Sequence, residues 1–146
     1  MVFIIALIVA KRAISSWPIT ANVSNSAHQI SLQLDPDDRL VAAVGGAARY
    51  LADAAGLAQD VILQFQASVL SACRHCFHCH SSDQPCDITL RRSTDRLEVE
   101  VALPGTEPPP EDKPSWEGID EVHCESREDA AVLRLTKYVP PNPPAD

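Results

Sequence analysis

The chain has 146 residues, of which 45% are hydrophobic and 5% aromatic, and its formal net charge is −8. This length suits one domain with a single core, which must be built mainly from aliphatic side chains. An acidic chain lacks the clustered Lys and Arg that bind a phosphate backbone, so nucleic acid is excluded as an expected partner.

The first 27 residues contain one apolar run, Val2 to Ala10, followed by a polar and mixed stretch that we interpret as a linker. A membrane-spanning helix needs roughly 20 apolar residues, so no membrane span is expected from this run. A secretory signal carries its positive charge before the apolar segment, whereas Lys11 and Arg12 follow it here. Three interpretations stay open: a disordered or misassigned start, a short helix packed on a neighbour, and a targeting segment. We expect residues 1–27 to be an accessory or disordered apolar run plus linker.

A strand and a helix are predicted next. His28 to Leu34 alternates apolar and polar residues, which is the period of a half-buried strand. Asp35-Pro36 then suits the N-cap and the first turn of a helix that ends near Gly56. Gly45-Gly46 inside this helix costs roughly 1 kcal/mol per residue relative to alanine, and close approach of another helix would offset that cost.

A second, longer helix is predicted from Gln59 to about His80. Its apolar stripe is the strongest periodic signal in the chain, because successive members lie three or four residues apart: Ile62, Phe65, Val69, Cys73, Cys76 and His80. Ser71, His75 and His78 fall on the opposite side of the helical wheel. We expect them to form a partly exposed polar face.

Two hairpins complete the predicted order, with strands over Asp87–Ser93, Arg96–Leu103, Val122–Arg127 and Ala131–Val139. The stretch between the hairpins is Pro- and Glu-rich, and Trp116 to Asp120 is expected to form one helical turn. Residues 140–146 form a Pro-rich tail. The order predicts an α+β domain over residues 28–139. In it, a mostly antiparallel sheet of about five strands is covered on one face by two helices.

This order and four strings resemble the ATP-binding domain of bacterial anti-sigma-factor serine kinases, which belong to the GHKL, or histidine-kinase-like, ATPase superfamily. The strings are AARYLADAAGL, SVLSACRHCF, DRLEVEVALPG and IDEVHCESREDAAVLRLTKYV. The resemblance implies a histidine-kinase-like sandwich, here without the lid and the third helix. It also implies protein partners, namely a sigma factor or a small antagonist protein, and the homodimer that many members form.

The residues that carry ATP chemistry in that family are replaced in this chain. Ser71 stands where the family has the glutamate that takes a proton from the attacking serine, and a hydroxyl cannot take it. His75 replaces the asparagine whose carbonyl helps to hold Mg²⁺, a cation that prefers oxygen ligands. Leu103 replaces the aspartate that accepts a hydrogen bond from adenine, and Gly105 alone remains of that landmark.

The Gly-rich phosphate loop and the helix after it have no counterpart between Gly105 and Ile119. We therefore expect a non-catalytic domain that does not bind ATP and Mg²⁺ tightly and that acts through a protein partner. A residual ATP-dependent serine kinase with atypical ligands is the alternative from the enzyme class.

The Cys- and His-rich end of the long helix suggests other chemistry. Cys76 to His80 fits the C-x-x-C-H haem attachment pattern, which would need export and a second axial ligand. The closely spaced cysteines also repeat the start of an iron–sulfur run, without the fourth ligand at the required spacing. Zinc held by Cys73, Cys76 and His80, or thiol redox sensing, is a further alternative. The simplest interpretation makes Cys73 and Cys76 small core residues.

The five cysteines do not suggest a disulfide framework, because their number is odd and three of them share one helix. A reducing compartment is the expectation that fits this usage. We therefore expect a cytoplasmic protein.

Overall fold

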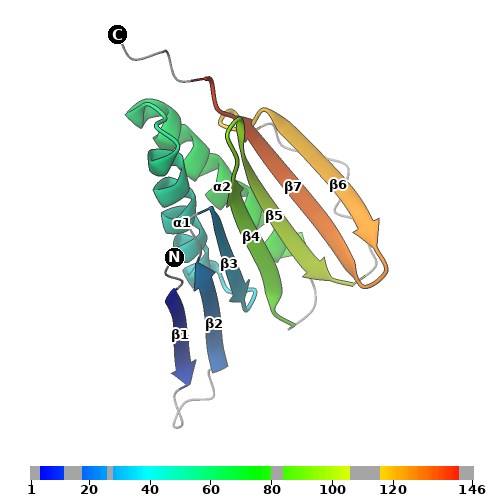
Figure 1. Cartoon of the computed structure of the whole chain (residues 1–146). Helices are drawn as coiled ribbons and strands as arrows, with labels where there is room; N and C mark the ends of the chain where they lie inside the picture. Colours follow the sequence, from blue (N-terminus) through cyan, green and yellow to red (C-terminus); the bar gives the residue numbers. More distant parts are fainter. Residues whose placement is uncertain (1–3, 12–17, 26–27, 80–83, 106–115, 142–146) are drawn as a thin grey trace.

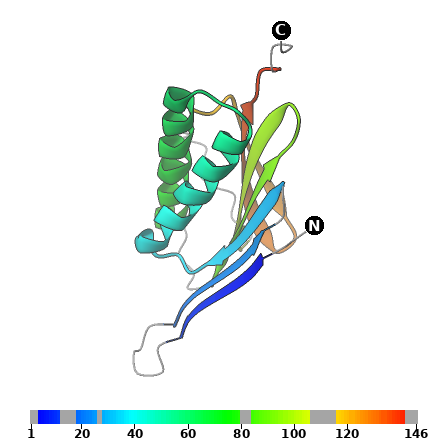
Figure 2. The same ribbon diagram turned by 60° about the vertical axis from the view of Figure 1, so that its left-hand side comes forward.

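The computed structural model describes residues 4–11, 18–25, 28–79, 84–105 and 116–141 (Figure 1). It has two layers, an antiparallel sheet and a pair of helices that packs on one face of that sheet (Figures 1 and 2). This arrangement confirms the predicted α+β class and the predicted layering.

Within the described residues, seven strands follow one another across the sheet in the order β1-β2-β3-β4-β5-β7-β6. Their bounds are β1 Ile4–Lys11, β2 Pro18–Asn25, β3 Gln29–Leu34, β4 Cys86–Arg92, β5 Arg96–Pro104, β6 Glu121–Arg127 and β7 Ala130–Tyr138. The helices are α1 Val41–Ala54 and α2 Gln59–Cys79, and the short 3-10 turn η1 Asp38–Leu40 leads into α1.

Strands β3 to β7 are the five that alternation predicted, but β1 and β2 were not foreseen. The linker expected from residue 11 onward is wrong for residues 18–25, which form β2 and pair with β3 from Ala21↔Leu34 to Asn25↔Ile30. Residues 4–11 form β1, which pairs with β2. The backbone N–H and C=O groups of a strand form hydrogen bonds with a neighbouring strand, which a local pattern does not identify. The apolar run in β1 also lacks the alternation of apolar and polar residues that is typical of a half-buried strand.

The core lies between the helices and β3 to β7. On α2, the buried residues Ile62, Phe65, Val69, Cys73 and Cys76 are each at most 2% exposed. The predicted register of this helix is therefore confirmed, and with it the core position of Cys73 and Cys76. Ser71 and His78 are exposed and His75 is half-buried, as expected for the polar face. His80, the last expected member of the apolar stripe, lies outside the described residues.

Asp37, and not Asp35, caps the first helical segment. The Asp37 carboxylate accepts a hydrogen bond from the Arg39 amide at 2.9 Å, and its backbone is extended (φ −124°, ψ 123°), as an N-cap requires. Asp35 cannot serve because it lies in a tight turn, in which its carbonyl accepts from the Asp37 amide at 2.7 Å. The predicted end of the helix is confirmed by Gly56, whose φ is +81°.

Gly45 allows α1 and α2 to approach closely, as the sequence predicted. A Cβ atom at Gly45 would lie 2.7 Å from Cδ2 of Leu70 on α2. Gly46 differs, because a Cβ atom there would have no heavy atom within 4 Å. The cost of Gly45 is therefore offset by packing, whereas the structure shows no packing reason for Gly46.

The sheet face opposite the helices carries charged side chains on β5, β6 and β7. Glu100 on β5 forms ion pairs with Arg127 at 3.0 Å and with Arg134 at 3.3 Å, linking β5 to β6 and β7. In the part of the chain that the structure describes, no helix is long and apolar enough to cross a membrane. Most of the expected Pro-rich stretch and tail, residues 106–115 and 142–146, lies outside that part.

Candidate functional site

One flank of α2 carries the positions that the family resemblance assigns to ATP chemistry. Gln64, Ser68, Ser71 and His75 follow one another at helical spacing and so share this flank. The segment that leads into β6, residues 116–120, lies against it. This α2 flank, together with the segment, is the candidate site.

Trp116 covers the centre of the α2 flank. Its indole Nε1 donates a hydrogen bond to Ser71 Oγ at 3.2 Å. Its ring meets the His75 ring edge-on, with centroids 6.3 Å apart and planes at 67°. Only 8% of Trp116 is exposed, so the side chain is part of the core. The hydrogen bond to Ser71 gives the buried indole N–H an acceptor, which it would otherwise lack. The indole therefore occupies the space beside Ser71 and His75.

Gly118 fastens the same segment to α2 through its backbone. Its amide donates to Ser68 Oγ at 3.0 Å, and Ser68 is only 7% exposed. A Cβ atom on Gly118 would collide with the carbonyl of Gln64, so only glycine fits this contact. The helical turn expected at Trp116 to Asp120 is wrong. The segment forms a hydrogen-bonded turn without helix, in which the Ile119 amide donates to the Trp116 carbonyl at 3.0 Å. Both Trp116 and Gly118 contact α2 from this turn.

A shallow cavity of about 260 Å³ lies beside this contact. It is lined by Gln64, Ala67, Ser68, Ser71, Trp116 and Glu117. Its lining includes the buried residue Ser68 and the exposed residue Ser71, and the single charged lining residue, Glu117, is exposed and acidic. A negative charge at the rim disfavours a phosphate group.

The other two positions that the family resemblance assigns to a nucleotide site, Leu103 and Gly105, lie at the end of β5. Leu103 is 6% exposed and belongs to the same buried cluster as Trp116. Gly105 has a φ of +121° and donates its amide to the Asp129 carbonyl at 3.1 Å, which ties it to the turn between β6 and β7. Ser71 and His75 are thus brought together by Trp116, while Leu103 has a packing role and Gly105 a turn role.

The metal alternative involves residues with a different environment. Cys73 is fully buried, and burial, with Cys86 nearby as a second cause, raises the pKa of its thiol to about 12. Burial therefore disfavours the thiolate, which is the form that reacts with electrophiles. Among the described residues, no group of three or more His, Cys, Asp or Glu side chains could hold a metal ion. His80 and the Cys79 side chain lie outside that description.

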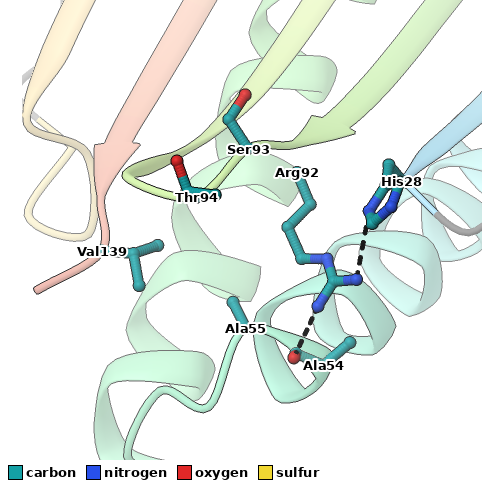
Figure 3. A pocket seen from close by; sticks show the side chains of 7 residues that line it. All are labelled: His28, Ala54, Ala55, Arg92, Ser93, Thr94 and Val139. Atoms are coloured by element: carbon teal, nitrogen blue, oxygen red, sulfur yellow. Dashed lines mark hydrogen bonds between the residues drawn. The ribbon is translucent and has the colours of Figure 1, made fainter. Parts of the chain in front are cut away.

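A second cavity, of about 460 Å³, lies where the β4–β5 hairpin meets the end of α1 (Figure 3). Arg92 reaches from β4 into this region, where its Nη1 donates to the Ala54 carbonyl at 2.8 Å and its Nη2 lies 3.2 Å from His28 Nδ1. A cation bonded to the last carbonyls of a helix satisfies them and complements the helix dipole. We interpret Arg92 as the C-terminal cap of α1.

Sequence reasoning missed the roles of Trp116, Gly118 and Arg92. Trp116 left one usable signal, since a tryptophan in a chain with so few aromatics is expected to be buried and to need a partner for its N–H. Arg92 left none, because His28, Ala54 and Arg92 meet only in the folded chain.

No known protein-family model matches this chain, and no curated protein matches it significantly. The resemblance to anti-sigma-factor kinases rests on the four sequence strings and on the order of helices and strands.

Proposed function

We propose that this protein is a non-catalytic, protein-binding regulator resembling an anti-sigma factor of a partner-switching circuit, with its own tryptophan in place of a nucleotide. The observation that carries the proposal is the contact of Trp116 with Ser71 and His75. The resemblance assigns these two positions to the catalytic base and to a Mg²⁺ ligand. The buried indole takes the Ser71 hydroxyl as its hydrogen-bond partner and occupies the space beside His75, so neither side chain is left as the family's nucleotide chemistry would need it.

The chemistry of the substituted residues supports the same proposal. Ser71 already accepts the Trp116 N–H, and a serine hydroxyl is not a general base in the absence of an activating partner. Leu103 offers no hydrogen-bond acceptor from its side chain where adenine recognition would need one. Loss of several parts of one catalytic site favours a role in binding.

The outer side of the helix pair is the surface that we expect a protein partner to use. Tyr50 on α1 is 57% exposed and Leu63 on α2 is 49% exposed, whereas most large apolar side chains of the described chain are buried. A groove of about 320 Å³ is lined by Tyr50 and by Gly46, Arg49, Asp53, Gln59 and Ile62, the last of which precedes Leu63 in α2. Exposed aromatic and aliphatic side chains around a groove are typical anchors of protein interfaces.

The test is co-purification of the tagged full-length chain with sigma factors and their antagonist proteins from the native host, identified by mass spectrometry. Tyr50→Ala and Leu63→Ala are expected to lose the captured partner. Tyr138→Ala removes a side chain of similar exposure, 44%, at the end of β7 and is expected to keep it.

If neither sigma factors nor their antagonist proteins were recovered, the proposed regulatory function would be contradicted. If the chain phosphorylated a captured protein on serine in the presence of Mg-ATP, the alternative of a residual serine kinase would hold in place of the non-catalytic regulator.

A further inference from the structure

The cavity between the end of α1 and the β4–β5 hairpin combines apolar and basic groups. Its volume of about 460 Å³ lies in the lower part of the range of small-molecule sites, roughly 300–1,000 Å³. Ala54, Ala55 and Val139 supply apolar surface, and Arg92 supplies a guanidinium (Figure 3). Among the described residues that line the cavity none is acidic, although the chain has 20 acidic residues against 12 basic ones. The lining therefore suits a ligand that is partly apolar and negatively charged.

The guanidinium of Arg92 is positioned by neutral groups. Its Nη1 donates to the Ala54 carbonyl at 2.8 Å, and its Nη2 lies 3.2 Å from His28 Nδ1. Because an arginine can only donate, this nitrogen of His28 accepts and its imidazole is neutral. A carboxylate offers two charged oxygens to the planar guanidinium, and such two-point pairs are among the strongest hydrogen bonds in proteins. A carboxylate would therefore displace His28, whose side chain is exposed and can turn toward solvent.

The end of α1 limits the charge of the ligand. The last carbonyls of a helix carry roughly half a negative charge, which opposes an anion beside Ala54. Together with the guanidinium they leave a net charge of roughly +0.5, which suits a singly charged anion better than a phosphate dianion. A phosphate would also have no apolar part to place against Ala55 and Val139.

We infer that this cavity binds a small carboxylic acid, with the carboxylate on Arg92 and the apolar body against Ala55 and Val139. The inference does not depend on the proposed regulatory function, because the cavity shares no lining residue with the one on the α2 flank. For a ligand of about ten non-hydrogen atoms, a dissociation constant on the order of 1 mM is expected.

Titration of the isotope-labelled full chain with benzoate, followed by the backbone amide signals in NMR, tests the inference. The amides of Ala55, Ser93 and Thr94 are expected to shift with one common dissociation constant. Benzamide has the shape of benzoate without its charge, and acetate has the charge without the ring. Each is expected to bind about tenfold more weakly than benzoate. Inorganic phosphate is also expected to bind more weakly.

Arg92→Gln and Arg91→Gln remove the same charge from adjacent positions of β4 and form a matched pair. Arg92→Gln is expected to weaken benzoate binding about tenfold, and Arg91→Gln is expected to leave it unchanged. Arg92→Lys keeps the charge, and a lysine can still bond to the last carbonyls of α1, but it lacks the planar fork. It replaces Arg92→Gln if that variant does not fold by urea unfolding, and it is expected to weaken binding less. If neither variant folds, the comparison of benzoate with benzamide on wild type decides.

Four results would overturn the inference. They are benzoate that shifts none of the three amides, benzamide or phosphate that binds as tightly as benzoate, an Arg92→Gln variant that binds benzoate like wild type, and an Arg91→Gln variant weakened as much as Arg92→Gln.

Discussion

The indole nitrogen of Trp116 lies 3.2 Å from Ser71 Oγ, so a residue just before β6 is hydrogen-bonded to the position on α2 that the family resemblance assigns to a catalytic base. The His75 ring, one turn further along α2, meets the same indole edge-on. Two positions that would face a nucleotide in an active kinase therefore face a side chain of the protein itself. This contact leads to the expectations that Mg-ATP does not stabilise the protein and that Trp116 does.

Mg-ATP is expected not to stabilise the protein. A ligand that binds only the native state adds RT ln(1 + [L]/Kd), which is about 0.4 kcal/mol for 1 mM ligand and a Kd of about 1 mM. The indole beside Ser71 and His75 makes weaker binding the expectation. Thermal unfolding with Mg-ATP, compared with Mg²⁺ alone, is the measurement. A rise in Tm of several degrees that requires ATP would contradict the proposal that Trp116 takes the place of a nucleotide.

Trp116→Ala is expected to lower the free energy of unfolding by about 3–5 kcal/mol, as for other buried aromatic residues. Trp116→Phe keeps most of the apolar burial but loses the bond to Ser71, which is worth about 1 kcal/mol. Urea unfolding of Trp116→Phe, Ser71→Ala and the double variant completes a thermodynamic cycle. A coupling energy of zero would mean that the hydrogen bond does not contribute to stability.

Gly118→Ala is expected to destabilise the protein by about 1–3 kcal/mol, because the added methyl group collides with the backbone of α2 at Gln64. Gly46→Ala is the matched control. It lies in α1 with open space around it, so alanine should stabilise the helix by about 0.5–1 kcal/mol. Both changes are measured by urea unfolding. Equal effects of the two substitutions would show that the contact between residues 116–118 and α2 is not tight.

The buried thiols are expected to react slowly with a thiol reagent under native conditions. Cys73, Cys76 and Cys86 are at most 1% exposed, whereas Cys124 on β6 is half-buried. Among these four thiols, that of Cys124 should therefore be modified first, as followed by mass spectrometry of digests at increasing times. Equally rapid modification of Cys73 and Cys124 would mean that α2 opens readily or has a different register.

Stability is expected to fall as the pH rises from about 9 to about 12. Burial is the main cause that raises the pKa of Cys73 and of Cys86 from an ordinary value of 9.0 to about 12. Between these values the unfolded chain loses the thiol protons while the folded chain keeps them, so each unit of pH favours unfolding. The stabilising contribution is complete below pH 9 and is lost as the pH approaches 12.

The measurement is the urea midpoint as a function of pH for wild type and for Cys73→Ala and Cys86→Ala. Each variant removes one of the thiols, so the fall in stability should become shallower. Tyr and Lys side chains also titrate in this range, and their contribution is common to wild type and variants. Identical pH profiles would show that these thiols do not contribute.

The sequence by itself determined the elements whose pattern is local. The spacing of Ile62, Phe65 and Val69 was enough to place α2 and to bury Cys73 and Cys76, because a helix has one period and one core-facing stripe. Alternation likewise placed β3 to β7. Local pattern was less certain at the start of α1, where Asp35 and Asp37 are equally suitable caps by residue type and only the turn geometry selects Asp37.

Tertiary structure alone decided the features that depend on a neighbour far along the chain. Residues 4–11 form a strand by pairing with residues 18–25, and their continuous apolar run has no alternation that would indicate a strand. Residues 18–25 differ, because Ile19, Ala21 and Val23 alternate with polar residues, a local signal that the linker interpretation left unused. Trp116 meets Ser71 across 45 residues of sequence, and Arg92 meets Ala54 across 38. The packing of whole elements determines the hydrogen-bond partners of buried polar groups. The polar face of α2 that carries Ser71 and His75 could therefore be predicted from the sequence, whereas the tryptophan beside them could not.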